Sequence, residues 1–294
     1  MANKSNFFLR FFISKKKRKR IAAENLRIEI IDYFSNLPQE SISLEQKEVI
    51  EFLKNNSFST FPYSYQFNYN ANNIYIGVDD SDGLKYVLLD GKRLYFKSSS
   101  VKRIRNIYNS LLIEQDVRSP HRYLTDSFNI TPNDILVDIG AAEGNFTLSV
   151  IEKVKKAYIF ETNKRWIKAL NATFAPWKDK VEIINKFVSD NNDKNNVSLD
   201  TFFRNNPGIN FIKIDAEGAE SSIIKGAENI LSRQPNCKVV TCTYHKRDDE
   251  VVLYDMLKKM GFTMEYSNGY MIFNLDKDLK PPYLRRGLIR AWKN

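Results

Sequence analysis

VDIGAAEGNF, residues Val137–Phe146, is the stretch that decides the fold. The apolar run leading into it predicts a strand over 134–140, and Gly140 and Gly144 then bracket a tight turn into a helix. Such a unit brings a ligand close to the backbone and to the start of a helix. The GxxxG spacing disfavours a dinucleotide pyrophosphate, which GxGxxG turns bind, and a plain strand-to-helix turn is the alternative.

Strand and helix patterns alternate outward from this turn. The strands read as continuous apolar runs, which are typical of parallel strands buried on both faces. We predict strands over 134–140, 157–162, 181–189, 209–215 and 238–245, and helices over 145–154, 163–174, 198–206, 222–233 and 249–260. Asn268-Gly269, inside 262–274, is a hairpin signal and predicts an antiparallel pair at the end of the sheet. The expected fold is therefore α/β, with a Rossmann-like, mostly parallel sheet and an antiparallel last strand.

The residues before this sheet predict a helical and small β extension. Ser43 and Gln46 form a capping-box pattern, and Asp82-Gly83 and Asp90-Gly91 are turn signals. We predict helices over 21–34, 47–54 and 101–117, a linker over 58–73 and a small β-meander over 73–97.

The net charge of +10 belongs to the two ends of the chain. Residues 1–20 carry eight of the 45 Lys and Arg and residues 280–294 carry five, with no acid in either, which leaves 32 bases against 35 acids elsewhere. A slightly acidic body argues against a nucleic-acid groove. FFLRFFIS followed by KKKRKR (7–20) is too short to span a membrane and has the wrong order for a signal peptide. It suits an anionic membrane surface, and a solvated terminus is the alternative.

The two cysteines and the absence of a membrane span bear on location. Cys237 and Cys242 have neither a disulfide framework nor a metal-ligand spacing, so we expect two buried thiols in a reducing compartment. The expected location is the cytoplasm, where residues 1–20 would contact the inner face of the membrane.

Polar side chains close four of the predicted strands. Asp138 ends the first, Glu161 ends the second 23 residues later, Asp215 ends the fourth and His245 the fifth. Open α/β sheets bind ligands at this edge, and an acid at the place of Glu161 accepts hydrogen bonds from a ribose diol; a surface glutamate is the alternative. A nicotinamide enzyme would repeat the parallel half-sheet, so the antiparallel finish favours a methyltransferase.

Four short motifs carry a resemblance to a known family. They are VDIGAAEG (137–144), FET (160–162), SLDTF (198–202) and FIKIDAEGAE (211–220), and KGAENIL (225–231) and His245 fit as well. Through them the chain resembles the FkbM-type methyltransferases over about residues 134–275. The resemblance implies a class I methyltransferase sheet, S-adenosyl-L-methionine as cofactor, and O-methylation of a sugar or secondary metabolite. Ala142 departs from the GANxG turn of the family, so one cofactor contact is missing unless Glu143 or Asn145 supplies it.

The candidate site residues lie in the turn and at the strand ends. The cofactor-binding candidates are Asp138, Gly140, Ala141, Glu143, Gly144, Glu161, Thr162, Ser189 and Asp215. A sugar hydroxyl is a poor nucleophile until its proton has an acceptor. His245 is the first candidate for that base, beside Asp215, and His121 is the second, in a segment that could close over the site with Arg122 and Tyr123. A structural role is the alternative for each histidine.

A divalent metal is a further alternative at this edge. Asp215, Glu217 and Glu220 with His245 have the ligand chemistry for an ion that would lower the pKa of a hydroxyl. Acids at a helix start also stabilise the helix dipole without any ion, so we do not favour a metal.

The expected function is an S-adenosylmethionine-dependent O-methyltransferase acting on a hydroxyl of a sugar, glycan or glycolipid-type small molecule, as in polysaccharide biosynthesis. Two alternatives remain: an RNA or protein methyltransferase that docks through the basic ends, and an inactive binding protein with a methyltransferase fold. The acidic body and the lack of an NPPY-type motif weigh against the first, and the missing asparagine at Ala142 keeps the second open. The expected regions are a basic arm and helical region (1–70), a β-meander and helix that cap the site or bind substrate (71–130), a methyltransferase domain (131–275) and a basic tail (276–294).

Overall fold

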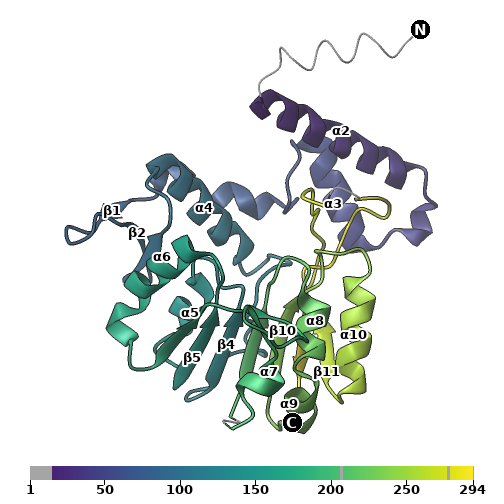
Figure 1. Ribbon diagram of the computed structural model, residues 1–294. Coiled ribbons are helices and arrows are strands. Elements are labelled where there is room, and N and C mark those ends of the chain that lie inside the picture. Colours follow the sequence, from purple (N-terminus) through teal and green to yellow (C-terminus); the bar gives the residue numbers. More distant parts are fainter. Residues whose placement is uncertain (1–14, 206–207, 277–278, 294) are drawn as a thin grey trace.

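The centre of the computed structural model, which describes residues 15–205, 208–276 and 279–293, is a seven-stranded sheet (Figure 1). Its strands are β4 (Ile135–Ile139), β5 (Lys156–Phe160), β6 (Val181–Ile184), β9 (Phe211–Ile214), β10 (Lys238–Cys242), β11 (Thr263–Tyr266) and β12 (Leu288–Trp292). Their order is β11-β12-β10-β9-β4-β5-β6. β4 pairs in parallel with β5 on one side and β9 on the other, so the strand order reverses at β4. The predicted Rossmann-like, mostly parallel sheet is confirmed.

Helices cover both faces of the sheet (Figure 1). Successive residues of β4 point to opposite faces, so Leu136 packs in one apolar cluster and Val137 in the other. The first cluster includes α4 (Val101–Glu114), α5 (Asn145–Val150) and α6 (Lys164–Phe174). The second includes α7 (Leu199–Phe202), α8 (Glu220–Lys225), α9 (Glu228–Arg233) and α10 (Asp249–Lys259). A short 3-10 helix, η4 (Ala175–Trp177), and a two-stranded sheet of β7 (Phe187–Val188) and β8 (Asn196–Val197) complete this region.

The predicted antiparallel pair at the end of the sheet is confirmed, but its last strand lies beyond the predicted range 262–274. β11 pairs with β12, which inserts between β11 and β10 and runs antiparallel to both. The predicted hairpin at Asn268-Gly269 is therefore wrong, and so is the basic tail over 276–294, because 288–292 form a strand inside the sheet. The sequence did not predict β12 because Arg290 interrupts the apolar run of residues 288–292. Its guanidinium is buried and donates to the carbonyl oxygens of Arg122 (2.6 Å) and Tyr123 (3.2 Å).

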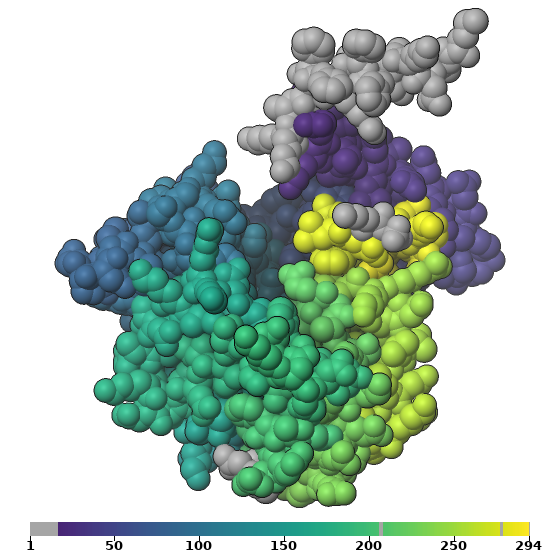
Figure 2. Space-filling model, in the orientation of Figure 1, coloured from purple at the N-terminus to yellow at the C-terminus, as the bar shows by residue number. Residues whose placement is uncertain are grey.

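The chain between β11 and β12, residues 267–287, is called the return segment and fastens the N-terminal helices to the sheet. Figure 2 shows it in yellow between the purple helices and the green body. It packs against α2 (Lys15–Ser35) and α3 (Leu44–Asn55) through Ile272 and Leu284. Glu45 of α3 accepts a hydrogen bond from the Gly269 amide (2.6 Å) and pairs with Arg286 (2.8 Å).

Two N-terminal predictions are confirmed and one is wrong. The Ser43–Gln46 capping box starts α3 after a 3-10 turn, η1 (Gln39–Ser41). The meander is a three-stranded sheet of β1 (Gly77–Val78), β2 (Lys85–Leu89) and β3 (Lys92–Phe96). The expected linker over 58–73 is instead folded, with 3-10 helices η2 (Ser64–Asn68) and η3 (Ala71–Asn73) and with Tyr63 and Tyr65 buried under the return segment. Its aromatic residues supply apolar surface that an exposed linker does not need.

None of the helices in the described part of the chain is both long and apolar enough to cross a membrane. The predicted membrane-contacting stretch lies in part outside the described residues, because the structure describes α2 only from Lys15. Cys237 and Cys242 are both buried free thiols, as expected.

Candidate functional site

The glycine turn after β4 places backbone against the end of β9. Gly140 has a φ of +71°, and a Cβ atom there would lie 1.9 Å from the carbonyl oxygen of Asp215. Gly144 has a φ of +79°, and a Cβ atom there would lie 2.6 Å from Leu170 Cδ2. Only glycine meets both the dihedral and the space requirement at these positions. The GxxxG pattern therefore lets the turn pack closely against the end of β9 and against α6.

Glu161 ties the end of β5 to this turn. Its Oε2 accepts a hydrogen bond from the Ala142 amide (3.0 Å), and its Oε1 accepts one from the Asn163 amide (2.6 Å). Each carboxylate oxygen has a further lone pair for a ligand. Ala142 has a φ of +47°, a region that asparagine enters more easily than alanine. The backbone at Ala142 thus keeps the shape that the missing asparagine would favour.

A cleft of about 390 Å³ opens at this edge of the sheet. Its lining residues are Lys97, Ile139, Gly140, Ala142, Phe160, Glu161, Thr162, Asn163, Trp166, Lys186, Phe187, Val188, Asp215, Ala216, Glu217, Ala219 and Ile223. Most of the lining is apolar, and a few charged groups converge on it, which is typical of small-molecule sites. Of the predicted cofactor-binding residues, Gly140, Glu161, Thr162 and Asp215 line the cleft.

Other predicted cofactor-binding residues lie behind the lining. Asp138 is fully buried; Thr147 Oγ1 donates to its Oδ2 (2.7 Å), and Lys213 Nζ lies 3.1 Å from its Oδ1. Lys213 also donates to the carbonyl of Gly140 (2.9 Å). Asp138 therefore supports the turn through Lys213 and does not face the cleft. Ala141, Glu143, Gly144 and Ser189 are also outside the lining, and the neighbours of Ser189, residues 186–188, line it instead.

Asp215 is the centre of a polar network at the end of β9. The hydroxyl of Tyr123 donates to its Oδ2 (2.8 Å), and the hydroxyl of Tyr244 lies 3.4 Å from its Oδ1. Burial acts to raise the pKa of Asp215, but the positive charge of Lys213 and the two histidines and the Tyr123 hydrogen bond outweigh it and lower that pKa to about 2. Asp215 is therefore a fixed negative charge on the cleft wall.

Both histidines face Asp215, and each has a glutamate behind it. His245 Nε2 lies 3.6 Å from Asp215 Oδ1, and its Nδ1 lies 2.9 Å from Glu220 Oε1. His121 Nε2 lies 3.8 Å from Asp215 Oδ2, and its Nδ1 lies 3.2 Å from Glu114 Oε1. The two carboxylate–histidine pairs have the arrangement in which the carboxylate fixes the tautomer and stabilises the charged ring.

Of the two histidines, His245 has the glutamate that is held more firmly beside its ring. Burial acts to lower its pKa, but the hydrogen bond and charge of Glu220, with the charges of Asp215 and Glu217, raise it above the usual 6.5. The Glu220 carboxylate is completely buried and also accepts from the Ala216 amide (2.9 Å), so it is held firmly beside the ring.

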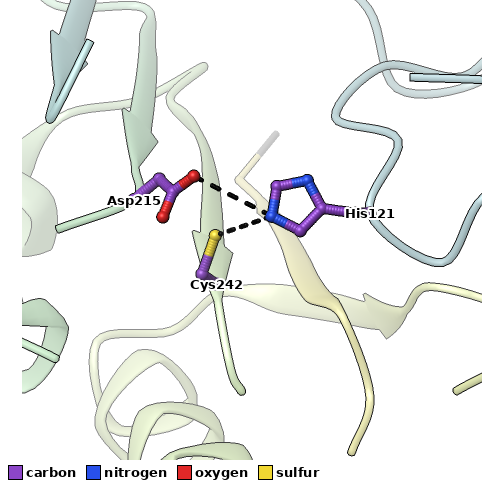
Figure 3. A group of neighbouring side chains, drawn as sticks. All are labelled: His121, Asp215 and Cys242. Carbon is purple, nitrogen blue, oxygen red and sulfur yellow. Dashed lines mark hydrogen bonds and ion pairs between the residues drawn. The ribbon is translucent and has the colours of Figure 1, made fainter. Parts of the chain in front are cut away.

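His121 sits deeper than the sequence suggested. It is only 1% exposed, and its Nε2 contacts the Tyr244 hydroxyl (3.0 Å) and Cys242 Sγ (3.5 Å), as Figure 3 shows for the thiol. Burial raises the pKa of Cys242 well above its usual value. Arg122, from the same segment, donates to the carbonyl of Gln115 (2.6 Å). These contacts anchor the segment in the fold.

Two groups of side chains among the described residues have metal-ligand spacing. They are Asp215, Glu220 and His245, and the group His121, Asp215 and Cys242 drawn in Figure 3. The predicted candidate Glu217 belongs to neither group. Within the first group His245 Nδ1 is already beside Glu220, and within the second His121 Nε2 is already beside the Tyr244 hydroxyl.

Sequence reasoning missed several residues of the site. Lys97 reaches the cleft from the β1–β3 appendage, and Tyr244 and Glu114 join the Asp215 network from separate elements. Trp166 and Lys186 line the cleft from segments that carry no recognisable motif. Two of these residues could have been found only because they are close in sequence to predicted site residues. Tyr244 precedes His245, and Lys186 lies three residues before Ser189.

Comparison with known proteins gives a family match over most of the chain. The family model described as methyltransferase FkbM domain matches residues 29–270. The solved FkbM methyltransferase of Methylobacillus flagellatus is 15% identical with a TM-score of 0.45; the match covers 65% of this chain and 53% of that one, so this chain spans about half of its length. A putative transferase of Pyrococcus horikoshii is 13% identical with a TM-score of 0.44, covering 72% of each chain. An rRNA methylase of Streptococcus thermophilus is 19% identical with a TM-score of 0.38, covering 56% of this chain and 89% of that one. No curated protein matches the chain.

Proposed function

We propose a chemical activity from the premise that the chain belongs to the FkbM methyltransferase family. The activity is transfer of a methyl group from S-adenosyl-L-methionine to a hydroxyl of a sugar, glycan or glycolipid-type small molecule. The observation that carries the proposal is the His245–Glu220 pair, 2.9 Å apart, which faces the cleft-lining Asp215. It supports a proton acceptor beside the cleft.

The residues of the cleft fit S-adenosylmethionine. Gly140 lines the cleft with backbone alone, and Glu161 presents a carboxylate suited to a ribose diol. Phe160, Val188 and Ile223 supply apolar surface for a purine. When bound, the cofactor supplies an electrophilic methyl group on a sulfonium sulfur. The protein then has to position the acceptor and take up its proton.

His245 fits the role of the base better than Asp215 does. The low pKa of Asp215, about 2, makes it a weak proton acceptor at neutral pH. His245 has a raised pKa and a buried glutamate that stabilises its charged form. His245 Nε2 would accept the hydroxyl proton, and Asp215, 3.6 Å away, would stabilise the positive charge that results. His121 is too deeply buried to touch an acceptor and holds Asp215 from behind.

Incubation with radiolabelled S-adenosylmethionine and a panel of acceptors tests the proposal. The panel holds free and nucleotide-linked sugars, glycolipid extract, RNA and total protein. We expect label in the carbohydrate or glycolipid fraction, stable to mild alkali, because methyl ethers resist the conditions that hydrolyse methyl esters. Label in RNA or protein would support an RNA or protein methyltransferase instead. Label in no fraction, together with no binding of the cofactor, would support an inactive binding protein.

A further inference from the structure

His121, Asp215 and Cys242 come from three distant segments of the chain and meet at one place (Figure 3). His121 lies between α4 and β4, Asp215 follows β9 and Cys242 closes β10. Cys242 is fully buried and His121 is 1% exposed, whereas Asp215 lines the cleft. The proposed methyl transfer gives the thiol of Cys242 no part, so this cluster has chemistry that the cleft alone does not explain.

The polar atoms of this cluster are separated as the ligands of a zinc ion are. His121 Nε2 lies 3.5 Å from Cys242 Sγ and 3.8 Å from Asp215 Oδ2, and the three ligand atoms all lie within 4.8 Å of one another. With Zn–N of about 2.0 Å and Zn–S of about 2.3 Å, neighbouring ligand atoms of a tetrahedral site are about 3.3–3.6 Å apart. The imidazole and the thiol are therefore already at ligand separation, and the carboxylate is within about 0.5 Å of it.

Glu114 favours the tautomer of His121 that can bind an ion. Its Oε1 lies 3.2 Å from His121 Nδ1, which favours the proton on that nitrogen and leaves the lone pair of Nε2 for a ligand. A carboxylate behind the ring is the usual arrangement for a histidine that binds a metal. The Tyr244 hydroxyl, 3.0 Å from Nε2 and 3.4 Å from Asp215 Oδ1, would give up its contact with Nε2 when an ion binds.

The charge around the cluster also favours a cation. Lys213 Nζ lies 3.1 Å from Asp138 Oδ1, so its charge is balanced there. In the part of the chain that the structure describes, the only basic side chains within ion-pair distance of Asp215 or Glu114 are histidines. A divalent ion would balance these two carboxylates, and a thiol that binds it releases its proton to the solvent.

The other group with ligand chemistry, Asp215, Glu220 and His245, fits an ion less well. His245 Nδ1 lies 2.9 Å from Glu220 Oε1, which is a hydrogen-bond distance and shorter than the roughly 3.3 Å expected between two ligands of one zinc ion. That group also lacks a thiolate, the ligand that selects zinc over magnesium or calcium.

We propose that His121, Asp215 and Cys242 bind one zinc ion, with the fourth position left to water. The ion would brace the chain between α4 and β4 against the ends of β9 and β10. It would also fix Asp215 through Oδ2, while Oδ1 stays directed at His245 Nε2, 3.6 Å away. The inference goes beyond the proposed function and does not depend on it, because zinc binding needs neither cofactor nor acceptor.

Zinc titration of the full chain, without a histidine tag and freed of metal by a chelator, tests the site. Calorimetry measures the Kd for wild type, Cys242→Ser, His121→Gln, Cys237→Ser and His245→Gln. Cys237→Ser is the matched control, because Cys237 is the other buried free thiol and belongs to neither group. Cobalt titration of wild type and Cys237→Ser adds a spectrum, because a thiolate bound to cobalt gives a charge-transfer band in the near ultraviolet.

We expect one zinc ion per chain in wild type and a Kd raised by about 100-fold or more in Cys242→Ser and His121→Gln, because even the outer partners of zinc ligands contribute about 10- to 100-fold. Cys237→Ser and His245→Gln should bind zinc within about 3-fold of wild type. The charge-transfer band should appear in both cobalt-loaded proteins, and it decides the question even if Cys242→Ser or His121→Gln does not fold.

No saturable zinc binding by wild type, or no charge-transfer band, would overturn the inference. A loss in Cys237→Ser equal to that in Cys242→Ser would do the same. Loss in His245→Gln with retention in Cys242→Ser would overturn it by placing the ion in the other group. None of these measurements involves S-adenosylmethionine, so each of these results leaves the proposed function standing.

Discussion

The side chains around Asp215 have pKa values moved in opposite directions by their surroundings. Asp215 is held ionised, while His245 is made more basic by Glu220. In active sites, neighbouring titratable groups often take acid and base roles because their surroundings move their pKa values apart. The arrangement supports the proposal that Asp215 acts electrostatically and that His245 takes up the proton.

Replacing His245 by Gln should lower the turnover number by about 10²- to 10⁴-fold, the usual contribution of a general base. The Kd for S-adenosylhomocysteine should stay within about 3-fold of wild type, because His245 does not line the cofactor cleft. Initial-rate kinetics and calorimetry on the same preparations measure the two quantities. An unchanged turnover number would remove His245 from the mechanism.

The pH profile of the turnover number tests the same assignment. Because His245 accepts a proton only when neutral, activity should rise with pH through a midpoint above 6.5, the usual value for histidine. Glu220→Gln removes the negative charge that raises this pKa, so the midpoint should move to lower pH. A profile whose midpoint is the same in wild type and Glu220→Gln would contradict the pairing.

Strand ends and motif spacing were sufficient to predict that Glu161, Asp215 and His245 lie at one edge of the sheet. They could not predict that Asp138 is buried on Lys213, because a strand-end acid looks the same whether it points up to the ligand or down into the core. The sequence also could not predict that Lys97 lines the cleft, because its position depends on how β3 packs on α6.

The turn between β4 and α5 is the element on which the cleft depends. Its backbone passes so close to β9 that a side chain at Gly140 would overlap the Asp215 carbonyl. Any rearrangement there moves both the cleft lining and Asp215. The turn therefore links the stability of the sheet directly to ligand binding.

Gly140→Ala should both destabilise the fold and abolish cofactor binding. Gly91→Ala is a matched control, because Gly91 has a similar φ of +77° but a Cβ atom there would meet nothing within 4 Å. The control should cost only the left-handed strain of about 1–2 kcal/mol. Thermal melts should show at least twice as large a fall in Tm for Gly140→Ala. Equal falls in Tm would mean that the contact with Asp215 relaxes without cost.

The alternation of strands and helices in the sheet was predicted correctly, but the predicted strand 181–189 is divided into β6 and β7, and the predicted helix 222–233 into α8 and α9. The prediction failed at β12, because Arg290 interrupts the apolar run and its guanidinium is paired with Glu265 and hydrogen-bonded to two carbonyls only in the folded chain. It also mistook residues 58–73 for a linker, since Tyr63 and Tyr65 become buried only under the distant return segment. Long-range pairing of this kind leaves no local signal.

The basic residues at the start of α2 are not among those that line the cleft. The amino end of α2 projects away from the sheet (Figure 1), and residues 17–20 at that end are exposed bases. We propose that this end contacts anionic membrane lipid on the cytoplasmic face, which would bring the cleft near a glycolipid acceptor. About 1 kcal/mol per base is expected at such a surface.

Replacing both Arg18 and Lys19 by Glu, which reverses the charge at each position, should weaken co-sedimentation with phosphatidylserine vesicles by about tenfold or more. Lys258→Glu with Lys259→Glu, on exposed positions at the end of α10, makes the same change in net charge and should have little effect. Neutral phosphatidylcholine vesicles should bind none of these proteins. Equal loss in the two double variants would indicate a response to net charge alone.

The most direct test of the account is calorimetric titration of the full chain and Glu161→Ala with S-adenosylmethionine. We predict saturable binding by wild type and a Kd raised by about 10- to 100-fold in Glu161→Ala, because a carboxylate that accepts from the ribose diol is lost. No binding by wild type at about 1 mM, or an unchanged Kd in Glu161→Ala, would contradict the placement of the cofactor in this cleft.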